Sequence, residues 1–260
     1  MTSFEVTRGS SALVLGIPHT GTFVPPDIAA RLNDTGKALS DTDWHIHTLF
    51  KDLADDLTSV RATFHRYVID ANRDPSGQSL YPGQNTTGLI PETDFDNAPL
   101  WNDPPKDADT KQRLMDWHAP YHAAIQAELA RVKSIHGHAI LFDCHSIRSV
   151  IPHLFEGTLP DFNIGTNLGV TCDPQVEALV RDAAQNSPFS HVLNGRFKGG
   201  WTTRHYGQPQ IGIHAIQLEI AQSTYLTTQA PPWAYDTAKS AKLRITLREM
   251  LTALKSWSPK

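Results

Sequence analysis

Several features that would point to a particular class of protein are scarce in this sequence. Only two cysteines, Cys144 and Cys172, occur among 260 residues, so a disulfide framework does not organise the fold. No apolar run approaches the roughly 20 residues of a membrane-spanning helix, and the first residues lack the basic segment and apolar core of a secretory leader. The formal net charge of -4 gives no electrostatic reason to expect nucleic acid. We therefore expect a cytoplasmic protein without membrane or nucleic-acid partners.

Length and composition indicate one globular domain. The chain is 40% hydrophobic and 19% charged, which is ordinary for a soluble protein with a packed core. Neither a linker-like stretch, a shift in composition nor an internal repeat marks a boundary, and 260 residues suffice for one large core. We expect a single domain over residues 1–260.

Strand-like and helix-like patterns alternate along the chain. Buried-strand runs lie at residues 12–17, 139–142 and 211–220, with shorter ones at 60–63 and 67–69. Helical spacing of apolar residues covers 109–135, with a break near Pro120, and 234–254. Asp173-Pro174 has the form of a cap and a first-turn proline and predicts a helix over 174–186, and another helix is expected from 40–42 through Leu57. This alternation predicts an α/β fold of three layers, αβα, in which helices cover both faces of a mixed, mainly parallel sheet.

Residues 74–105 are predicted to form a long irregular loop. They are dense in Pro, Gly, Asn and Asp and show no convincing periodicity. A stretch of about 30 such residues exceeds the usual loop length in a compact domain. It either covers a site or wanders over the surface, and the sequence leaves both interpretations open.

Two histidines stand where strands end. His19 follows the run at 12–17, and His145 follows the run at 139–142. Ligands of open α/β proteins bind at this edge of the sheet, so the pair suggests a shared metal ion. Hydrolytic zinc sites have three protein ligands from His, Asp and Glu. For the third we favour Asp43, while the competing candidates are Asp41, His45 and His47. Most of the 13 histidines are expected to be surface or structural residues.

Further charged residues predict an acidic substrate. Arg73, with the neighbouring amide of Asn72, is suited to bind a carboxylate, although a structural salt bridge is the alternative. Arg148 and Arg204 are additional candidates for anion recognition. Glu219 lies among apolar residues on an expected inner strand, where burial beside a metal would suit it to accept and return a proton. A buried ion pair is the alternative for Glu219.

Five short motifs follow one another along the chain in an informative order. They are Ile17-Pro18-His19-Thr20-Gly21, Asp41-Thr42-Asp43-Trp44, Asp70-Ala71-Asn72-Arg73-Asp74-Pro75, Asp143-Cys144-His145-Ser146 and Gln217-Leu218-Glu219. Together they resemble the N-formylglutamate amidohydrolase family, whose fold is related to that of the zinc carboxypeptidases. Each motif is modestly specific, but the order and spacing span nearly the whole chain and make the resemblance strong.

The resemblance implies a function and roles for single residues. It implies hydrolysis of N-formyl-L-glutamate to formate and L-glutamate, the closing step of one bacterial route of histidine degradation. Zinc would be held by His19, Asp43 and His145, and Glu219 would serve as base and then acid. Asn72 and Arg73 would hold one substrate carboxylate, with Arg148 or Arg204 on the other. Carboxypeptidases carry a glutamate ligand where this sequence has Thr22, and the family pattern points to Asp43 in its place.

Other functions compete with this one. A zinc-dependent acylamino-acid hydrolase or carboxypeptidase acting on another acidic substrate would use the same residues. A cysteine nucleophile is disfavoured because Cys144 and His145 are neighbours on a strand and point to opposite faces. A binding module for an acidic metabolite would have little use for two histidines and a buried glutamate. Histidines also bind iron, cobalt or nickel, so the sequence favours zinc without excluding those metals.

Overall fold

The computed structural model describes residues 2–79 and 83–259. Seven strands form one sheet in the order β1-β3-β2-β4-β7-β5-β6. Their bounds are β1 Phe4–Thr7, β2 Leu13–Ile17, β3 Thr58–Ala62, β4 Ala139–Ile147, β5 Phe162–Gly165, β6 His191–Leu193 and β7 Ile213–Ala221. The pairs β1·β3 and β5·β7 are antiparallel, and the other four are parallel. The expected mixed, mainly parallel sheet is confirmed.

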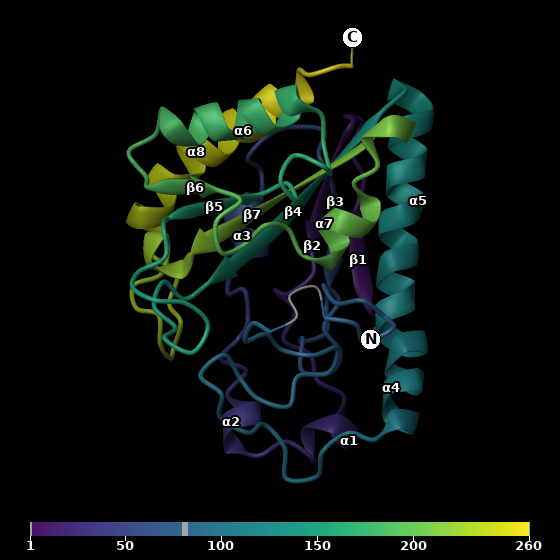
Figure 1. Ribbon diagram of the computed structural model, residues 1–260, viewed down its shortest axis with the longest axis vertical. Helices are drawn as coiled ribbons and strands as arrows, with labels where there is room; N and C mark the ends of the chain where they lie inside the picture. Colours follow the sequence, from purple (N-terminus) through teal and green to yellow (C-terminus); the bar gives the residue numbers. More distant parts are fainter. Residues whose placement is uncertain (1, 80–82, 260) are drawn as a thin grey trace.

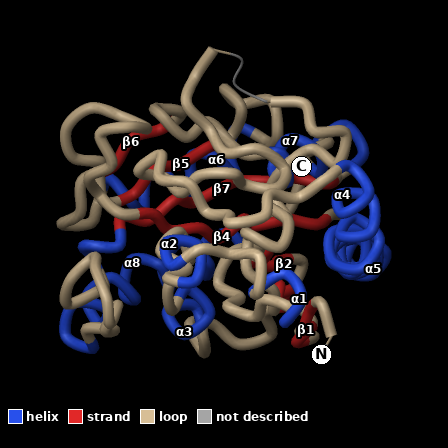
Figure 2. Tube along the Cα trace, turned by 90° about the horizontal axis from the view of Figure 1, so that it is seen from below, coloured by secondary structure: helices blue, strands red, loops and turns tan. Residues whose placement is uncertain are grey.

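Helices cover both faces of this sheet. The α-helices are α1 Pro26–Ala29, α2 Asp34–Lys37, α3 Ile46–Phe50, α4 Asp107–Arg113, α5 Ala119–His136, α6 Pro174–Gln185, α7 Trp201–Tyr206 and α8 Thr237–Lys255. A π-helix, η1 Leu114–His118, joins α4 to α5, and short 3₁₀ helices are η2 Pro209–Ile211 and η3 Gln222–Thr224. Figure 2 shows the strands as a layer with α5 on one side and α3 and α8 on the other. The predicted three layers are confirmed.

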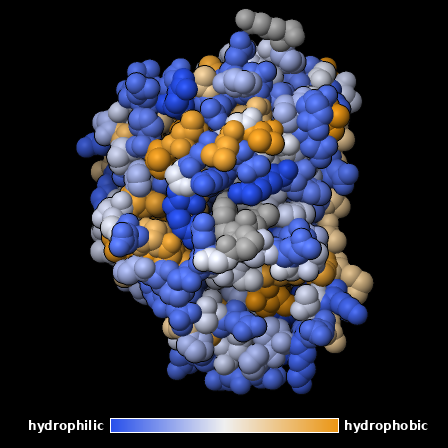
Figure 3. Space-filling view, viewed as in Figure 1, coloured by the Kyte–Doolittle hydropathy of each residue, from blue (hydrophilic) through white to orange (hydrophobic). Residues whose placement is uncertain are grey.

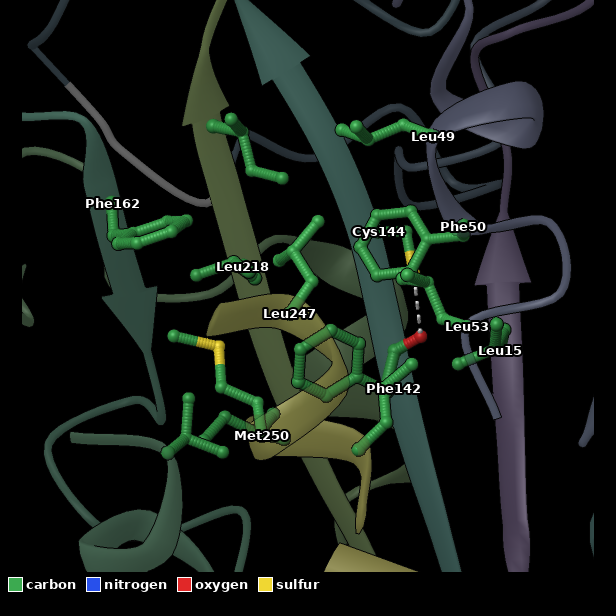
Figure 4. Packing of buried hydrophobic residues seen from close by; sticks show 14 of the residues in the cluster. Leu15, Leu49, Phe50, Leu53, Phe142, Cys144, Phe162, Leu218, Leu247 and Met250 are labelled. Carbon is green, nitrogen blue, oxygen red and sulfur yellow. Dashed lines mark hydrogen bonds between the residues drawn. The ribbon is translucent and has the colours of Figure 1, made fainter. Parts of the chain in front are cut away.

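The central strands alternate their side chains between two cores. In β4, Phe142 and Cys144 join the core beneath α3, α6 and α8, whereas Leu141 joins the core beneath α5. Figure 4 shows Cys144 packed with Phe142 and Phe50, where its thiol donates to the Phe142 carbonyl. Burial raises the pKa of this thiol well above its usual value. Cys144 therefore belongs to the core, and the next residue, His145, faces the opposite side.

Both helices expected in the C-terminal half form, and an aspartate caps each of them. Asp173 accepts a hydrogen bond from the Gln175 N–H at the start of α6, whose first residue is Pro174. Asp236 caps α8 in the same way. These two helices pack on each other over the sheet (Figure 1).

Two predicted elements are wrong in detail. The helix expected from 40–42 through Leu57 is only α3, because the chain leaves helical geometry at Lys51 and takes positive φ at Asp52 and Asp56. The strand expected at 67–69 is a buried turn, in which the Val68 carbonyl accepts a hydrogen bond from Arg113. In both places side chains from distant helices satisfy backbone groups that a longer helix or a strand would have paired.

The long loop and the shortest helices gather at one end of the molecule. Figure 1 shows α1, α2 and the blue loop segments below the sheet. The parts of residues 74–105 that the structure describes contain only turns and isolated bridges, as predicted. On the face shown in Figure 3, hydrophobic residues lie in small separate groups among hydrophilic ones. Among residues 2–79 and 83–259, no helix combines the length and hydropathy needed to cross a membrane.

Candidate metal centre and substrate cavity

Three buried side chains converge from separate parts of the chain. His19 follows β2, Asp43 precedes α3, and His145 lies near the end of β4, next to β2 in the sheet. Each residue is only 2% exposed. The Asp43 N–H donates to the His19 carbonyl over 3.0 Å, which joins the first two segments directly. The strand order therefore brings His19 and His145 together, although they are 126 positions apart in the sequence.

The geometry of this cluster suits a small divalent cation. The Asp43 Oδ2 atom lies 3.8 Å from His19 Nδ1 and 3.3 Å from His145 Nδ1, and the two imidazole centroids are 5.0 Å apart. One ligand atom from each residue lies within 4.8 Å of the others. Tetrahedral zinc with bonds of about 2.0–2.1 Å places neighbouring ligand atoms about 3.3–3.5 Å apart. The three residues therefore fit a metal ion with only small movements.

A carboxylate lies next to the Nε2 atom of each histidine. His19 Nε2 lies 2.7 Å from Asp70 Oδ1, and His145 Nε2 lies 3.1 Å from Asp143 Oδ1. An Nε2–H that donates to a carboxylate leaves Nδ1 as the lone-pair nitrogen, and metal-binding histidines are typically oriented in this way. Asp70 thus directs His19 Nδ1 towards Asp43, and Asp143 lies on the Nε2 side of His145, whose Nδ1 also faces Asp43.

Arg66 balances part of the negative charge. Its Nη2 lies 3.0 Å from Asp70 Oδ2 and 3.0 Å from His19 Nδ1. A guanidinium and a metal ion cannot share one lone pair, so metal binding at His19 Nδ1 requires Arg66 to move off that nitrogen while keeping Asp70. Burial and the Arg66 charge both lower the pKa of His19, which keeps its imidazole neutral as a ligand must be.

Charged groups crowd this cluster and shift one another's pKa values. Although burial opposes ionisation, Arg73, His19 and Arg66 hold the pKa of Asp70 well below its usual value. Although burial also opposes protonation of His145, Asp143 and Asp43 raise its pKa well above the usual value. Buried carboxylates of this density need a cation close by. A divalent ion would supply one.

Glu219 stands beside the same cluster. It lies opposite His145 in the register of β4 and β7, and Gln217 Nε2 donates to its Oε2 over 3.2 Å. Burial raises its pKa to about 8, with the Asp43 charge adding to the effect and His145 opposing it. A carboxylate whose pKa is raised towards neutrality is suited to take up and return a proton.

The structure separates Asp43 from its three competitors. Asp41 Oδ2 accepts a hydrogen bond from the Phe95 N–H. His45 Nε2 lies 2.8 Å from the Trp233 carbonyl oxygen, and His47 Nδ1 lies 2.7 Å from Thr20 Oγ1. Each of these three is engaged elsewhere, and Asp43 is the one grouped with the two histidines.

A cavity of about 170 Å³ opens beside the cluster. It is small compared with the roughly 300–1,000 Å³ pockets that hold drug-sized ligands. Its lining includes the three clustered residues, Glu219, Asn72 and three arginines, Arg66, Arg73 and Arg196, together with parts of the 74–105 loop such as residues 85–89 and Phe95. The long loop therefore contributes a wall of the cavity.

The predicted anion-binding residues divide into two groups. Arg73 lines the cavity, where its Nε donates to the Thr87 carbonyl and its Nη1 lies 3.6 Å from Asp70. Arg148 forms an ion pair with Asp96, and Arg204 Nε donates to the Gly199 carbonyl. Neither of these two is among the described residues that line the cavity.

Asn72 is held tightly between α7 and His145. Its Oδ1 accepts a hydrogen bond from the Thr202 N–H, and its Nδ2 lies 3.2 Å from His145 Nε2. A side chain at Gly200 would come within 2.3 Å of the Asn72 amide, so this glycine permits the close approach. Gly200, the residue before α7, thus leaves room for Asn72.

The sequence prediction did not include four residues of the site. Asp70 and Asp143 are the carboxylates behind the histidines, and Arg66 and Arg196 line the cavity. Asp143 and His145 are two positions apart on a strand and so share a face, which is a signal that the sequence does contain. The positions of Arg66 and Arg196 depend on tertiary contacts and leave no such pattern.

The chain is similar to proteins of known name over nearly its whole length. A family model described as N-formylglutamate amidohydrolase matches residues 11–226. An N-formylglutamate deformylase of Pseudomonas aeruginosa is 47% identical over 255 residues, covering 96% of this chain and 95% of that protein. A Pseudomonas putida protein of the same name is 44% identical, with 96% and 94% covered. The crystal structure of N-formylglutamate amidohydrolase from Ralstonia eutropha has the same fold, with a TM-score of 0.80 at 24% identity and 97% of both chains covered.

Proposed function

This chain belongs to the N-formylglutamate amidohydrolase family, and we propose that it is a metal-dependent N-formylglutamate deformylase that releases formate and L-glutamate. The observation that carries the proposal is the buried cluster of His19, Asp43 and His145 at a small cavity lined by arginines. The cluster suggests a metal-assisted hydrolysis, and the arginines suggest an anionic substrate.

The three clustered residues would hold the metal ion. Two imidazoles and one carboxylate are a donor set typical of catalytic zinc, although iron, cobalt and nickel accept the same ligands. A bound zinc ion supplies Lewis acidity, which polarises a carbonyl group and activates water. Asp70 and Asp143 keep the two imidazoles oriented towards that position.

Glu219 would move the proton of the reaction. Its carboxylate lines the cavity beside His145 and is buried, with Gln217 holding one oxygen. As base it would accept a proton from the attacking water. As acid it would deliver that proton to the amide nitrogen when the bond to the formyl carbon breaks.

Arg73 and Arg196 would bind the two carboxylates of the substrate. A dianion in a small cavity needs more than one cation, and both guanidinium groups lie in the lining. Arg196 is oriented by the Leu154 and Asn85 carbonyls, to which its Nε and Nη2 donate over 3.0 Å each. We therefore propose Arg196 in the role that the sequence suggested for Arg148 or Arg204.

The size of the cavity favours a small acyl group. Leu154 and Phe197 narrow the space near Arg196, and the whole cavity measures about 170 Å³. A formyl group fits such a space more readily than a peptide or a long acyl chain. The alternative activity on larger acylamino acids is disfavoured for the same reason. Cytoplasmic location and a place in histidine degradation stay predictions from the sequence.

Release of the free amino acid from a panel of substrates, measured as new primary amine and, for the formyl substrates, also as formate, tests this proposal. N-formyl-L-glutamate, N-formyl-L-aspartate, N-acetyl-L-glutamate and a glutamyl dipeptide would be assayed with and without a chelator. We expect turnover to be highest with N-formyl-L-glutamate, to be lost with the chelator and to return with added zinc. Activity confined to the acetyl or peptide substrates would refute the deformylase assignment, and full activity after complete metal removal would refute the metal.

A further inference from the structure

The helical segment formed by α4, η1 and α5 contacts the backbone of the loop that supplies Asp70, Asn72 and Arg73 to the site. Three of its side chains reach backbone carbonyls of residues 68, 71 and 73. Arg113 Nη1 donates to the Val68 carbonyl over 2.9 Å. His122 Nε2 lies 2.8 Å from the Ala71 carbonyl oxygen, and His118 Nε2 lies 3.1 Å from that of Arg73. All three side chains are buried, at 3–8% exposed for the histidines and 4% for Arg113.

The π-helix η1 brings these three side chains onto one face. They are five and four positions apart. In a regular α-helix each residue turns about 100°, so a step of five places side chains roughly 140° apart. The wider turn absorbs the extra residue, and the Ala119 N–H bonds to the Leu114 carbonyl five positions back. Trp117, which a regular helix would align with Arg113, instead packs against Phe23 and Phe64.

Pro120 accounts for the position of this wide turn. It follows η1 as the second residue of α5 and has no N–H to give to the carbonyl four positions earlier. Because that carbonyl has no helical partner in any case, an extra residue in this turn costs little additional free energy. The break that the sequence predicts near Pro120 is thus the feature that aligns His118 with Arg113 and His122.

Both histidines are suited to donate to a carbonyl without carrying charge. A neutral imidazole has one N–H, and here it points from Nε2 to the loop. In His122 the other nitrogen, Nδ1, lies 3.0 Å from the Tyr206 hydroxyl, which can donate to it. Burial lowers the pKa of both histidines, that of His122 to about 3, so neither becomes cationic near neutral pH. His118 and His122 therefore act as fixed hydrogen-bond donors.

The loop they hold carries much of the site. Within it Asp70 accepts the Asn72 N–H and reaches His19, while Asn72 contacts His145 and Arg73 lines the cavity. We propose that Arg113, His118 and His122 are positioning residues that fix the carbonyls of residues 68–73 and thereby set Asn72 and Arg73 for the substrate. The kinetic part of this inference rests on the proposed deformylase function.

Paired variants at His118 test the inference. The amide of His118→Gln can still donate to the Arg73 carbonyl, whereas His118→Leu keeps the bulk and removes the donor. We expect His118→Leu to raise KM for N-formyl-L-glutamate about tenfold, with kcat within threefold and metal content unchanged. His118→Gln should stay within threefold of the parent in KM. If the leucine variant does not fold, His118→Asn, whose amide is too short to reach Arg73, replaces it.

Hydrogen exchange supplies a readout that needs no activity. The amides of Asp70, Asn72 and Arg73 are bonded to the Leu89 carbonyl, the Asp70 side chain and the Asp70 carbonyl, respectively. We expect them to exchange at least tenfold faster in His118→Leu than in the parent or in His118→Gln. Val180→Ala, a buried change on α6 in the core on the other face of the sheet, is the control that lowers the melting temperature without changing KM or exchange here.

The possible results separate the two proposals. Equal behaviour of the glutamine and leucine variants, in KM and in exchange, would overturn the positioning role. A KM change of the same size in Val180→Ala would also overturn it, since general destabilisation would then suffice. If the parent releases no formate at all, the proposed function fails, and the exchange rates alone decide whether the histidines fix the loop.

Discussion

Replacing Arg196 by leucine removes a cation from the substrate cavity while keeping part of the bulk of its stem. The guanidinium lines the cavity, lies over the Phe197 ring at 5.5 Å and is oriented by two backbone carbonyls. It is also partly buried, so it is less screened by solvent than a surface arginine. The loss of a substrate contact here should therefore be visible in the kinetics.

The size of the effect follows from the kind of bond that is lost. A hydrogen bond to a charged group contributes about 1.5–3 kcal/mol, and each 1.4 kcal/mol corresponds to a factor of ten. Partial exposure of Arg196 places the expectation in the lower part of this range. We therefore expect Arg196→Leu to raise KM for N-formyl-L-glutamate about 10- to 40-fold. Turnover should change less than fivefold, because Glu219 and the metal ligands are not altered.

Steady-state formate release measures this change in KM, and two substrates that each lack one carboxylate show which arginine binds which carboxylate. N-formyl-L-glutamine lacks the side-chain charge, and the 1-amide of N-formyl-L-glutamate lacks the α-carboxylate. We expect Arg196→Leu to lose its effect with one of these amides and Arg73→Leu with the other. Arg181→Leu, which removes a surface pair with Asp182, is the control. A KM within twofold of the parent in Arg196→Leu, or a larger rise in Arg148→Leu, would refute the assignment.

Three further changes probe the rest of the site and the fold. Glu219→Gln should lower kcat about 10²- to 10⁴-fold with KM and metal content nearly unchanged, as measured by formate release and elemental analysis. Asp70→Asn should weaken metal binding about 10- to 100-fold in a competitive chelator titration, because His19 loses the carboxylate behind it. Burial lowers the pKa of His122 from 6.5 to about 3, so its contribution to stability is present above pH 6.5 and is lost as the pH falls towards 3. At pH 5 the free energy of unfolding is lower by about 2 kcal/mol for this reason. In His122→Gln, unfolding near pH 5 should take up about one proton fewer than in the parent, which is measured as a smaller slope of the unfolding free energy against pH. The same slope in both proteins would contradict the burial of a neutral imidazole.

The sheet and its long helices could be predicted because local patterns decide them. The buried-strand runs before His19 and His145 became β2 and β4. The Asp173-Pro174 cap and the apolar spacing of residues 234–254 predicted α6 and α8. Alternation along β4 also predicted correctly that Cys144 turns away from His145. Each of these features depends on residues close together in the sequence.

The ends of short elements could not be predicted because distant donors decide them. Arg244 of α8 donates to the Leu49 and Lys51 carbonyls at the end of α3. Without that donor, the apolar spacing of Leu49, Leu53 and Leu57 suggests a longer helix than the chain forms. The same holds for the turn at 67–69, whose Val68 carbonyl is paired by Arg113 from a helix 45 positions away.

The candidate site likewise contains residues that the sequence predicted and residues that only tertiary packing brings there. His19, Asp43, His145, Glu219 and Arg73 were named from motifs, and the structure places all five at one cavity. Arg196 follows a short edge strand with no motif around it, and its nearness to Arg73 results from the course of the 74–105 loop and of the segment after β6. Which arginines face a cavity is decided by tertiary packing, and the sequence therefore suggested Arg148 and Arg204 instead.

Anomalous scattering at the zinc absorption edge, from a crystal grown with zinc, tests the metal centre most directly. The arrangement of His19, Asp43 and His145 predicts one strong peak within about 2.0–2.2 Å of both Nδ1 atoms and an Asp43 oxygen. A fully loaded, active crystal whose peak lies elsewhere, or whose two imidazoles contact no metal, would contradict the account.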